Sequence, residues 1–96
     1  MSDKYTKGMA TRRAVLGDAH VDRAEAQKTD FDVPFQELIT EGAWGTVWSD
    51  QTISPRERSL LTLALLAATG NFEDIPMHVR ATANTGASAD DIMQAF

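Results

Sequence analysis

The sequence predicts an all-α fold, and three observations support this prediction. Apolar residues recur three and four positions apart in several stretches, which is the spacing of one helix face. Ser, Pro and Gly stand where helices begin and end, most clearly around residues 54–70. The chain contains no β-rich run. At 96 residues it is shorter than a typical domain of ~150 residues, so we expect a single domain spanning residues 1–96.

The composition excludes several classes of protein. A net charge of −5 argues against a general nucleic-acid binder. The chain has no cysteine, and therefore no disulfide, thiolate metal site or thiol nucleophile. Its two histidines, at positions 20 and 78, are too far apart for a short metal motif, so we expect no metal. No stretch approaches the ~18 apolar residues of a membrane span. The first residues lack the apolar core of a secretion signal, which favours a cytoplasmic protein.

The first half of the chain predicts two helices joined by a polar connection. Residues 3–16 form a weakly amphipathic helix that ends at Gly17. Residues 18–31 are polar and mixed, and we expect a long connection with one helical turn in it. A second helix is expected over residues 34–48, with Asp32 as its N-cap.

Helix 34–48 carries an apolar stripe and two tryptophans. The residues expected in the core are Phe35, Leu38, Ile39, Gly42 and Ala43. Trp44 and Trp48 lie one turn apart, and we expect them to form either a packing anchor or an interface.

The best-defined helix lies between Ser54 and Gly70. Ser54 and Glu57 match a capping box, with Pro55 at the first helical position. The run 60–68 is apolar almost all round, so we expect this helix to be buried on nearly every side. Four short helices cannot cover it and the two tryptophans, and we therefore expect a homo-oligomer, a trimer or a dimer of trimers.

Two further helices are expected towards the C-terminus. One runs over residues 72–84 with Gly86 as its C-cap, and Pro76 indicates that its regular part begins late. The next begins at residues 88–91, where a serine is followed by acidic residues. The chain stops at Phe96 soon afterwards, so we expect the C-terminal helix to be incomplete.

A few side chains are candidates for chemistry. His78 lies between apolar Ile75 and Val79, and Asp74 one turn earlier can bias its charge and tautomer. A half-buried structural histidine is the alternative interpretation. Arg58 opens the apolar helix, where it can clamp a carboxylate or pair with a neighbouring acidic side chain.

The remaining cations are weaker candidates. Arg80 and the adjacent Arg12 and Arg13 can also bind anions, although an arginine on a helix is usually solvated. His20 lies in the polar connection, and we interpret it as solvated. The chain has no Ser-His-acid spacing and no Gly-rich phosphate loop.

Four segments, in this order and spacing, resemble the carboxymuconolactone decarboxylase family over essentially the whole chain. They are Arg12 to Arg23, Ala43 to Trp48, Arg58 to Leu66 and His78 to Ala81. The wider superfamily contains alkylhydroperoxidase-like proteins, which use a Cys-x-x-Cys pair upstream of a histidine. Residues 71–74, which correspond to that pair, hold no cysteine, so peroxidase chemistry is excluded.

The resemblance implies an all-α, alkylhydroperoxidase-like helical bundle that assembles into trimers or hexamers. It implies a carboxy-lyase that converts 4-carboxymuconolactone into the β-ketoadipate enol-lactone, a step of protocatechuate breakdown. The conjugated lactone ring can take the electron pair, so no cofactor is implied. Family chains continue beyond the position of Phe96, and we therefore expect a bundle truncated before its final helix.

The resemblance also implies roles for individual residues. We expect His78 to donate a proton to the dienolate, with Asp74 as its orienting neighbour. Arg58 and Arg80 are expected to hold substrate carboxylates, Arg80 only if its helix is flanked on both sides. The N-terminal matching segment adds the second-rank substrate-binding candidates Arg12, Arg13 and His20. Two alternatives stay open: a non-catalytic helical oligomerisation module, and a decarboxylase of a related carboxylated lactone.

Overall fold

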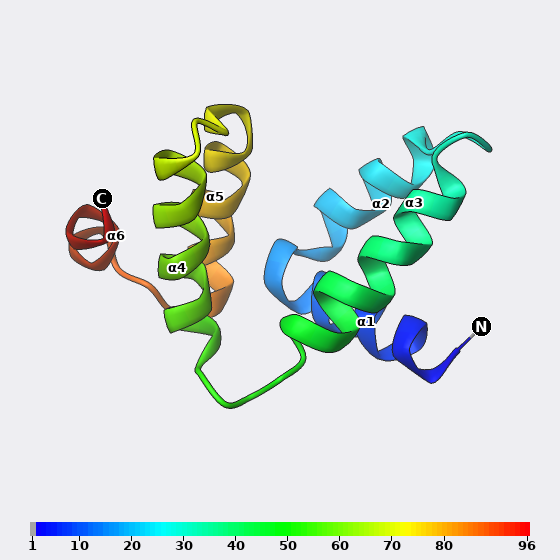
Figure 1. Cartoon of the computed structure of the whole chain (residues 1–96), viewed down its shortest axis with the longest axis horizontal. Helices are drawn as coiled ribbons and strands as arrows, with labels where there is room; N and C mark the ends of the chain where they lie inside the picture. The colour runs from blue at the N-terminus through cyan, green and yellow to red at the C-terminus, as the bar shows by residue number, and fades with distance from the viewer. Residues whose placement is uncertain (1) are drawn as a thin grey trace. The chain divides into compact units, whose positions relative to one another are not determined.

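The computed structural model describes residues 2–96, which form helices and no strand, so the predicted all-α fold is confirmed (Figure 1). The chain divides into two compact units, Met1–Gln51 (unit 1) and Thr52–Phe96 (unit 2). That they form a single domain stays a prediction. Over residues 2–96, no helix combines the length and the apolar character needed to cross a membrane.

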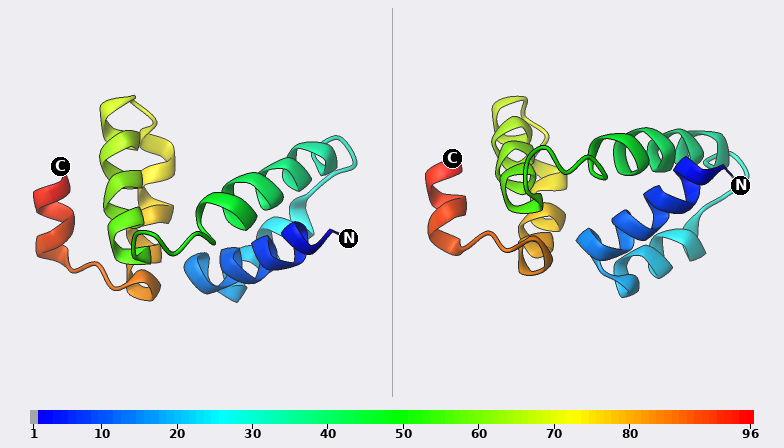
Figure 2. Two further views of the ribbon diagram at one scale, coloured as in Figure 1. Left: turned by 60° about the horizontal axis from the view of Figure 1, so that its bottom comes forward. Right: turned by 90° about the horizontal axis from the view of Figure 1, so that it is seen from below.

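Unit 1 is built from four consecutive helical segments. They are α1 (Asp3–Leu16), α2 (Asp18–Gln27), α3 (Val33–Ile39) and the π-helix η1 (Thr40–Val47). Helix α1 packs along η1 and also contacts α2 (Figure 2). The bounds of α1 agree with the predicted helix, and the backbone N–H of Gly17 donates to the carbonyl of Arg13 as its C-cap.

Helix α2 replaces the polar connection expected over residues 18–31, and that prediction was wrong. Its residues look solvated in sequence, but Val21 is completely buried in unit 1. Asp18 stands in the first turn, where a negative charge suits the helix dipole. Gly17, with φ of +90°, lets the chain reverse between α1 and α2 without a loop. Tertiary contact therefore stabilises a helix that its own composition does not predict.

The helix predicted over residues 34–48 has the expected extent but two geometries. It is α-helical to Ile39 and a π-helix from Thr40. The N–H of Trp48 donates to the carbonyl of Ala43, five residues earlier, at 2.8 Å. Trp44 and Trp48 are both buried, with ring centroids 5.3 Å apart, so within unit 1 they act as a packing anchor.

The apolar stripe predicted on this helix is only partly buried within the chain. Phe35 and Leu38 are 61% and 66% exposed. The core position in this region belongs instead to Thr40, which is 1% exposed and faces α1. Phe35 and Leu38 lie in the α-helical part, before the π-helix begins at Thr40, so the stripe read from α-helical spacing selects a face of α3 that this chain leaves open.

Unit 2 is a helical hairpin with a short third helix. Its elements are α4 (Pro55–Ala68), the 3-10 turn η2 (Phe72–Asp74), α5 (Ile75–Thr85) and α6 (Ala89–Ala95). Helices α4 and α5 lie side by side in every view (Figures 1 and 2). The late start of α5 is confirmed, and so are the predicted helix starts after Ser54 and Ser88, each with a complete capping box.

Helix α4 is not buried on nearly every side by the rest of the chain. Leu63 is completely buried, whereas Leu61 and Leu65 are 54% and 63% exposed. The hairpin partner α5, the turn η2 and the short α6 are the elements of unit 2 that pack on α4, and they leave part of its apolar circumference open. That partners from other subunits cover this part stays a prediction.

Candidate active site

His78 lies on the face of α5 that packs against α4. The residue is 9% exposed, and Ala81 and Thr82, three and four positions later, are buried on the same side. The Thr82 hydroxyl donates to the carbonyl of Val79, so its proton stays within α5. His78 is therefore held in an environment of helix backbone, small side chains and hydroxyl groups.

A side-chain bond between the helices defines the register of the hairpin. The Oγ of Ser59 on α4 lies 2.7 Å from the Oγ1 of Thr85 at the end of α5. Arg58 directly precedes Ser59 and is half-buried, and its carbonyl accepts a bond from the Thr62 hydroxyl at 2.8 Å. His78 is seven residues before Thr85, which is about 10 Å along an α-helix. Unit 2 thus carries one imidazole and one half-buried guanidinium on two packed helices.

Asp74 and Arg80 have different surroundings from His78. Asp74 is exposed at the N-cap position of α5, one turn before His78. Arg80 is exposed as well, because two residues along an α-helix are about 200° around its axis. The described structure of unit 2 therefore does not bring Arg80 onto the buried face that carries His78. Its substrate role stays a prediction for a site flanked by helices on both sides.

A surface pocket at the end of the hairpin is acidic. It is lined by Gly70, Asn71, Phe72, Glu73 and Asp74. Two carboxylates at this position repel a substrate that carries carboxylates itself. This pocket is therefore a poor carboxylate site, and the half-buried Arg58 near the start of α4 is the better candidate.

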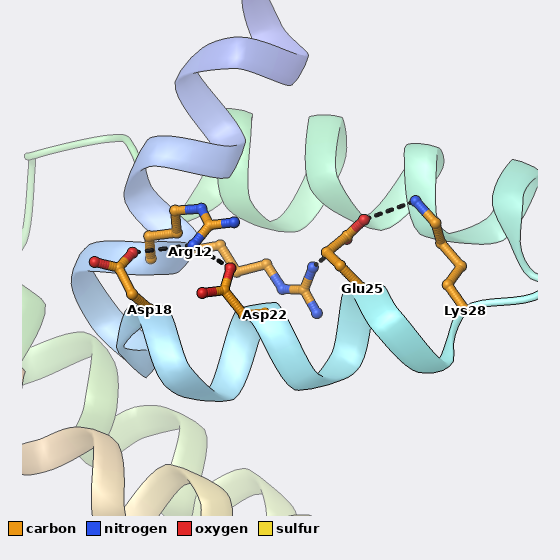
Figure 3. Close-up of polar contacts among 6 residues, drawn as sticks. Arg12, Asp18, Asp22, Glu25 and Lys28 are labelled. Carbon is orange, nitrogen blue, oxygen red and sulfur yellow. Dashed lines mark hydrogen bonds and ion pairs between the residues drawn. The ribbon is translucent and has the colours of Figure 1, made fainter.

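Arg12 is the buried charge of unit 1. It is 8% exposed, and its Nη1 donates to Oε1 of Glu25 on α2 at 3.1 Å (Figure 3). Lys28 donates to the other oxygen of Glu25 at 2.8 Å. The hydrogen bond from Lys28, reinforced by Arg12, lowers the pKa of Glu25 and keeps that carboxylate ionised beside the buried guanidinium.

Arg13 and His20 also lie in unit 1. Arg13 pairs with Asp18 at 3.1 Å and with Asp22 at 2.9 Å, and the hydrogen bonds that it donates to these carboxylates raise its pKa. His20 is half-buried on α2, not in an open connection. Sequence reasoning missed the acidic partners of both arginines. If residues 18–27 are recognised as a helix, the three- to four-residue spacing of Asp18, Asp22 and Glu25 predicts an acidic face that can pair with these arginines.

The arrangement suits proton transfer and carboxylate binding more than metal chemistry. Among residues 2–96, no group of three or more His, Cys, Asp or Glu side chains could hold a metal ion. A histidine can deliver a proton near neutral pH, and an arginine can hold a carboxylate by a charge-assisted hydrogen bond. Unit 2 has both groups on neighbouring helices.

Comparisons with known proteins find similarity to decarboxylases. Residues 34–96 match a family model described as the carboxymuconolactone decarboxylase family. A 4-carboxymuconolactone decarboxylase from Acinetobacter baylyi is 38% identical over 91 residues, which are 95% of this chain and 68% of that protein. The nitrosuccinic acid decarboxylase npaB from Metarhizium robertsii is 38% identical over 91 residues, which are 95% of this chain and 64% of that protein.

A further relative matches a shorter stretch. A 4-carboxymuconolactone decarboxylase from Pseudomonas putida is 57% identical over 42 residues, 44% of this chain and 88% of that one. No solved structure matches the chain. The segment matched by the family model contains Arg58, Asp74, His78 and Arg80, whereas Arg12, Arg13 and His20 precede it.

Proposed function

The chain belongs to the carboxymuconolactone decarboxylase family, and from this we propose that it removes CO2 from 4-carboxymuconolactone to give the β-ketoadipate enol-lactone. The observation that carries the proposal is the 38% identity to a 4-carboxymuconolactone decarboxylase over 95% of the chain. We also propose that the protein carries out this reaction in the cytoplasm.

The substrate itself supplies the electron sink for this reaction. When the C–C bond to the departing carboxylate breaks, its electron pair moves through the ring double bond to the lactone carbonyl and forms a dienolate. A proton then adds to the carbon next to that carbonyl and neutralises the dienolate. The protein has to hold the substrate carboxylates, stabilise the developing oxyanion and deliver one proton.

The residues of unit 2 fit these tasks. His78 donates the proton to the dienolate from its buried position on α5, and Asp74 at the start of α5 orients it. Arg58 holds the carboxylate that the substrate keeps. Arg80 is a second carboxylate clamp on the exposed side of α5. Arg12, Arg13 and His20 lie in unit 1 and stay second-rank predicted substrate contacts.

A turnover assay tests the proposal directly. The purified chain is incubated with 4-carboxymuconolactone, and substrate loss and CO2 release are followed with and without a chelator. We expect equal loss of substrate and release of CO2 in both conditions. Absence of turnover with and without added divalent metals would reject the assignment.

A second substrate is favoured by the match to the nitrosuccinic acid decarboxylase, which has the same identity over the same share of this chain. Nitrosuccinate is also a dicarboxylate, and its nitro group can take the electron pair left by CO2. It therefore needs the same retained-carboxylate anchor and the same proton donor. Comparing kcat/KM for the two substrates decides between them, and we expect the lactone to have the higher value.

We further propose that the chain forms a homo-oligomer, a trimer or a dimer of trimers. The support is the exposed apolar surface on α4, at Leu61 and Leu65, and on α3, at Phe35 and Leu38. A neighbouring subunit that covers these side chains removes their apolar area from water. Multi-angle light scattering at micromolar concentration measures the mass, and a monomer would contradict the proposal.

A further inference from the structure

The hydroxyl groups of Ser59 and Thr85 form a polar contact between α4 and α5. Ser59 is completely buried, and its Oγ lies 2.7 Å from the Oγ1 of Thr85. Around this link the two helices bury apolar side chains, with Leu63 at 0% and Ala81 at 2% exposure. A buried polar pair between two packed helices favours one register, because apolar contacts alone tolerate sliding.

Sliding one helix along the other breaks this pair at a high cost. A shift of one turn moves Thr85 about 5 Å away from Ser59. The Ser59 hydroxyl then stays buried without the Thr85 hydroxyl, and a buried hydroxyl that loses its partner costs more than the bond contributed. The pair therefore selects one alignment of the two helices.

That alignment determines how the two candidate site residues are placed. Arg58 precedes Ser59 by one residue, and His78 precedes Thr85 by seven. Because the helices are antiparallel, the two offsets add, and the pair keeps Arg58 about 12 Å from His78 along the hairpin axis. A long arginine side chain and a small dicarboxylate lactone can span such a separation. A shift by one turn changes this separation by about 5 Å. Arg58 and His78 then cannot contact the retained carboxylate and the protonated carbon at the same time.

We propose that Ser59 and Thr85 are positioning residues, which fix the register of α4 and α5 and so align Arg58 with His78 for decarboxylation. This inference rests on the proposed function for its catalytic consequence. Neither hydroxyl contacts the substrate in this proposal. Their effect is transmitted through the helix alignment alone.

The variants for the test remove or keep the hydroxyls without large changes in shape. S59A/T85V removes both, and apolar replacement of both partners is close to neutral for stability. T85V removes only the Thr85 hydroxyl, and it can be measured in place of the double variant if the double variant does not fold. T85S keeps both hydroxyls. T62V is the matched control, because the Thr62 hydroxyl bonds within α4 to the Arg58 carbonyl and not across the interface.

Two measurements are made on each folded variant: kcat and KM for 4-carboxymuconolactone, and the imidazole proton resonances of His78 by NMR at fixed pH. We expect S59A/T85V and T85V to lose at least about tenfold in kcat/KM and to shift the His78 resonances, while T85S and T62V resemble the wild type. Wild-type kcat/KM and unshifted resonances in S59A/T85V would overturn the proposal, and so would equal losses in T62V. If the wild type does not turn over, the proposed function fails, and the His78 resonances alone decide whether the pair sets the register.

Discussion

Gly8 on α1 and Thr40 on η1 approach so closely that a Cβ on Gly8 would overlap with the carbonyl oxygen of Thr40. A second glycine, Gly45, meets the carbonyl of Lys4 in the same way. The two backbones can pack at this distance only because neither glycine has a side chain. This contact positions η1, and with it the buried tryptophans, in the core of unit 1.

Replacing Gly8 with alanine should destabilise unit 1 strongly. The new methyl group meets backbone atoms, which cannot rotate away, so we expect a loss of about 3 kcal/mol, the upper end of ordinary overpacking. Gly42 is the matched control, because a Cβ there meets nothing within 4 Å. Gly42→Ala should change stability by less than about 0.5 kcal/mol. Urea unfolding followed by tryptophan fluorescence measures both, and equal stabilities would contradict the close packing.

Replacing His78 with alanine should lower kcat by about 10²–10⁴-fold, the usual contribution of general acid catalysis. KM should change little, because a group that acts in the transition state affects kcat most. Steady-state kinetics with 4-carboxymuconolactone measure both constants, and circular dichroism confirms that the variant is folded. A folded His78→Ala variant with near-normal kcat would refute the assignment of His78 as proton donor.

Replacing Arg58 with alanine should chiefly raise KM, by roughly 10–100-fold, as expected for a lost hydrogen bond to a charged group. Arg23→Ala is the control for loss of one positive charge, since Arg23 is exposed on α2. Arg80→Ala in the same assay measures whether the exposed side of α5 also holds a carboxylate. If Arg58→Ala and Arg23→Ala give the same KM, Arg58 is not a substrate anchor.

The ion pair between Arg56 and Asp91 should hold α6 on α4 well into the acid range. Arg56 donates to both oxygens of Asp91, at 2.9 and 2.6 Å, and these bonds, together with the Ser88 N–H, lower the pKa of Asp91. A carboxylate with a lowered folded pKa stabilises above its unfolded pKa of ~3.9, and this contribution is lost only as the pH falls through the folded pKa. The protection factors of the α6 amides, which compare each exchange rate with that of an unfolded chain at the same pH, should therefore stay high at about pH 3.

Asp91→Asn is the decisive variant for this prediction. It should speed amide exchange in α6 at neutral pH and remove the acid dependence, because the amide cannot ionise. Asp90→Asn, in the same turn but exposed, should have a much smaller effect. Equal exchange rates in the two variants would show that the pair does not hold α6.

The helices with local start and stop signals were predictable from sequence, and the rest depended on tertiary contact. Ser54 and Ser88 identify their helices because a capping box satisfies the first N–H groups within four residues. Helix α2 has no such box, and Val21 and the Arg12–Glu25 pair stabilise it against α1. The close packing of η1 against Gly8 is likewise a tertiary contact between segments more than thirty residues apart.

The candidate site was predictable in its residue types but not in its arrangement. His78 stands out in sequence as a lone histidine among apolar neighbours, and its burial agrees with that reading. The Ser59–Thr85 pair was missed, because a serine beside a leucine run gives no indication of the residue it meets 26 positions later. Pairings across a hairpin depend on register, and register is a property of the packed helices.

The wide turn of η1 has a consequence for how the length of this chain can change in evolution. A π-turn holds one residue more than an α-turn, so Thr40 and Gly45, five apart, both face α1. Loss of Gly42 leaves these two residues four apart, which is the repeat of an ordinary α-helix, and both still face α1. A deletion inside α4 instead rotates every later side chain by about 100° and separates Leu63 from its partners. Unit 1 therefore has a place where a one-residue deletion is absorbed, and α4 has none.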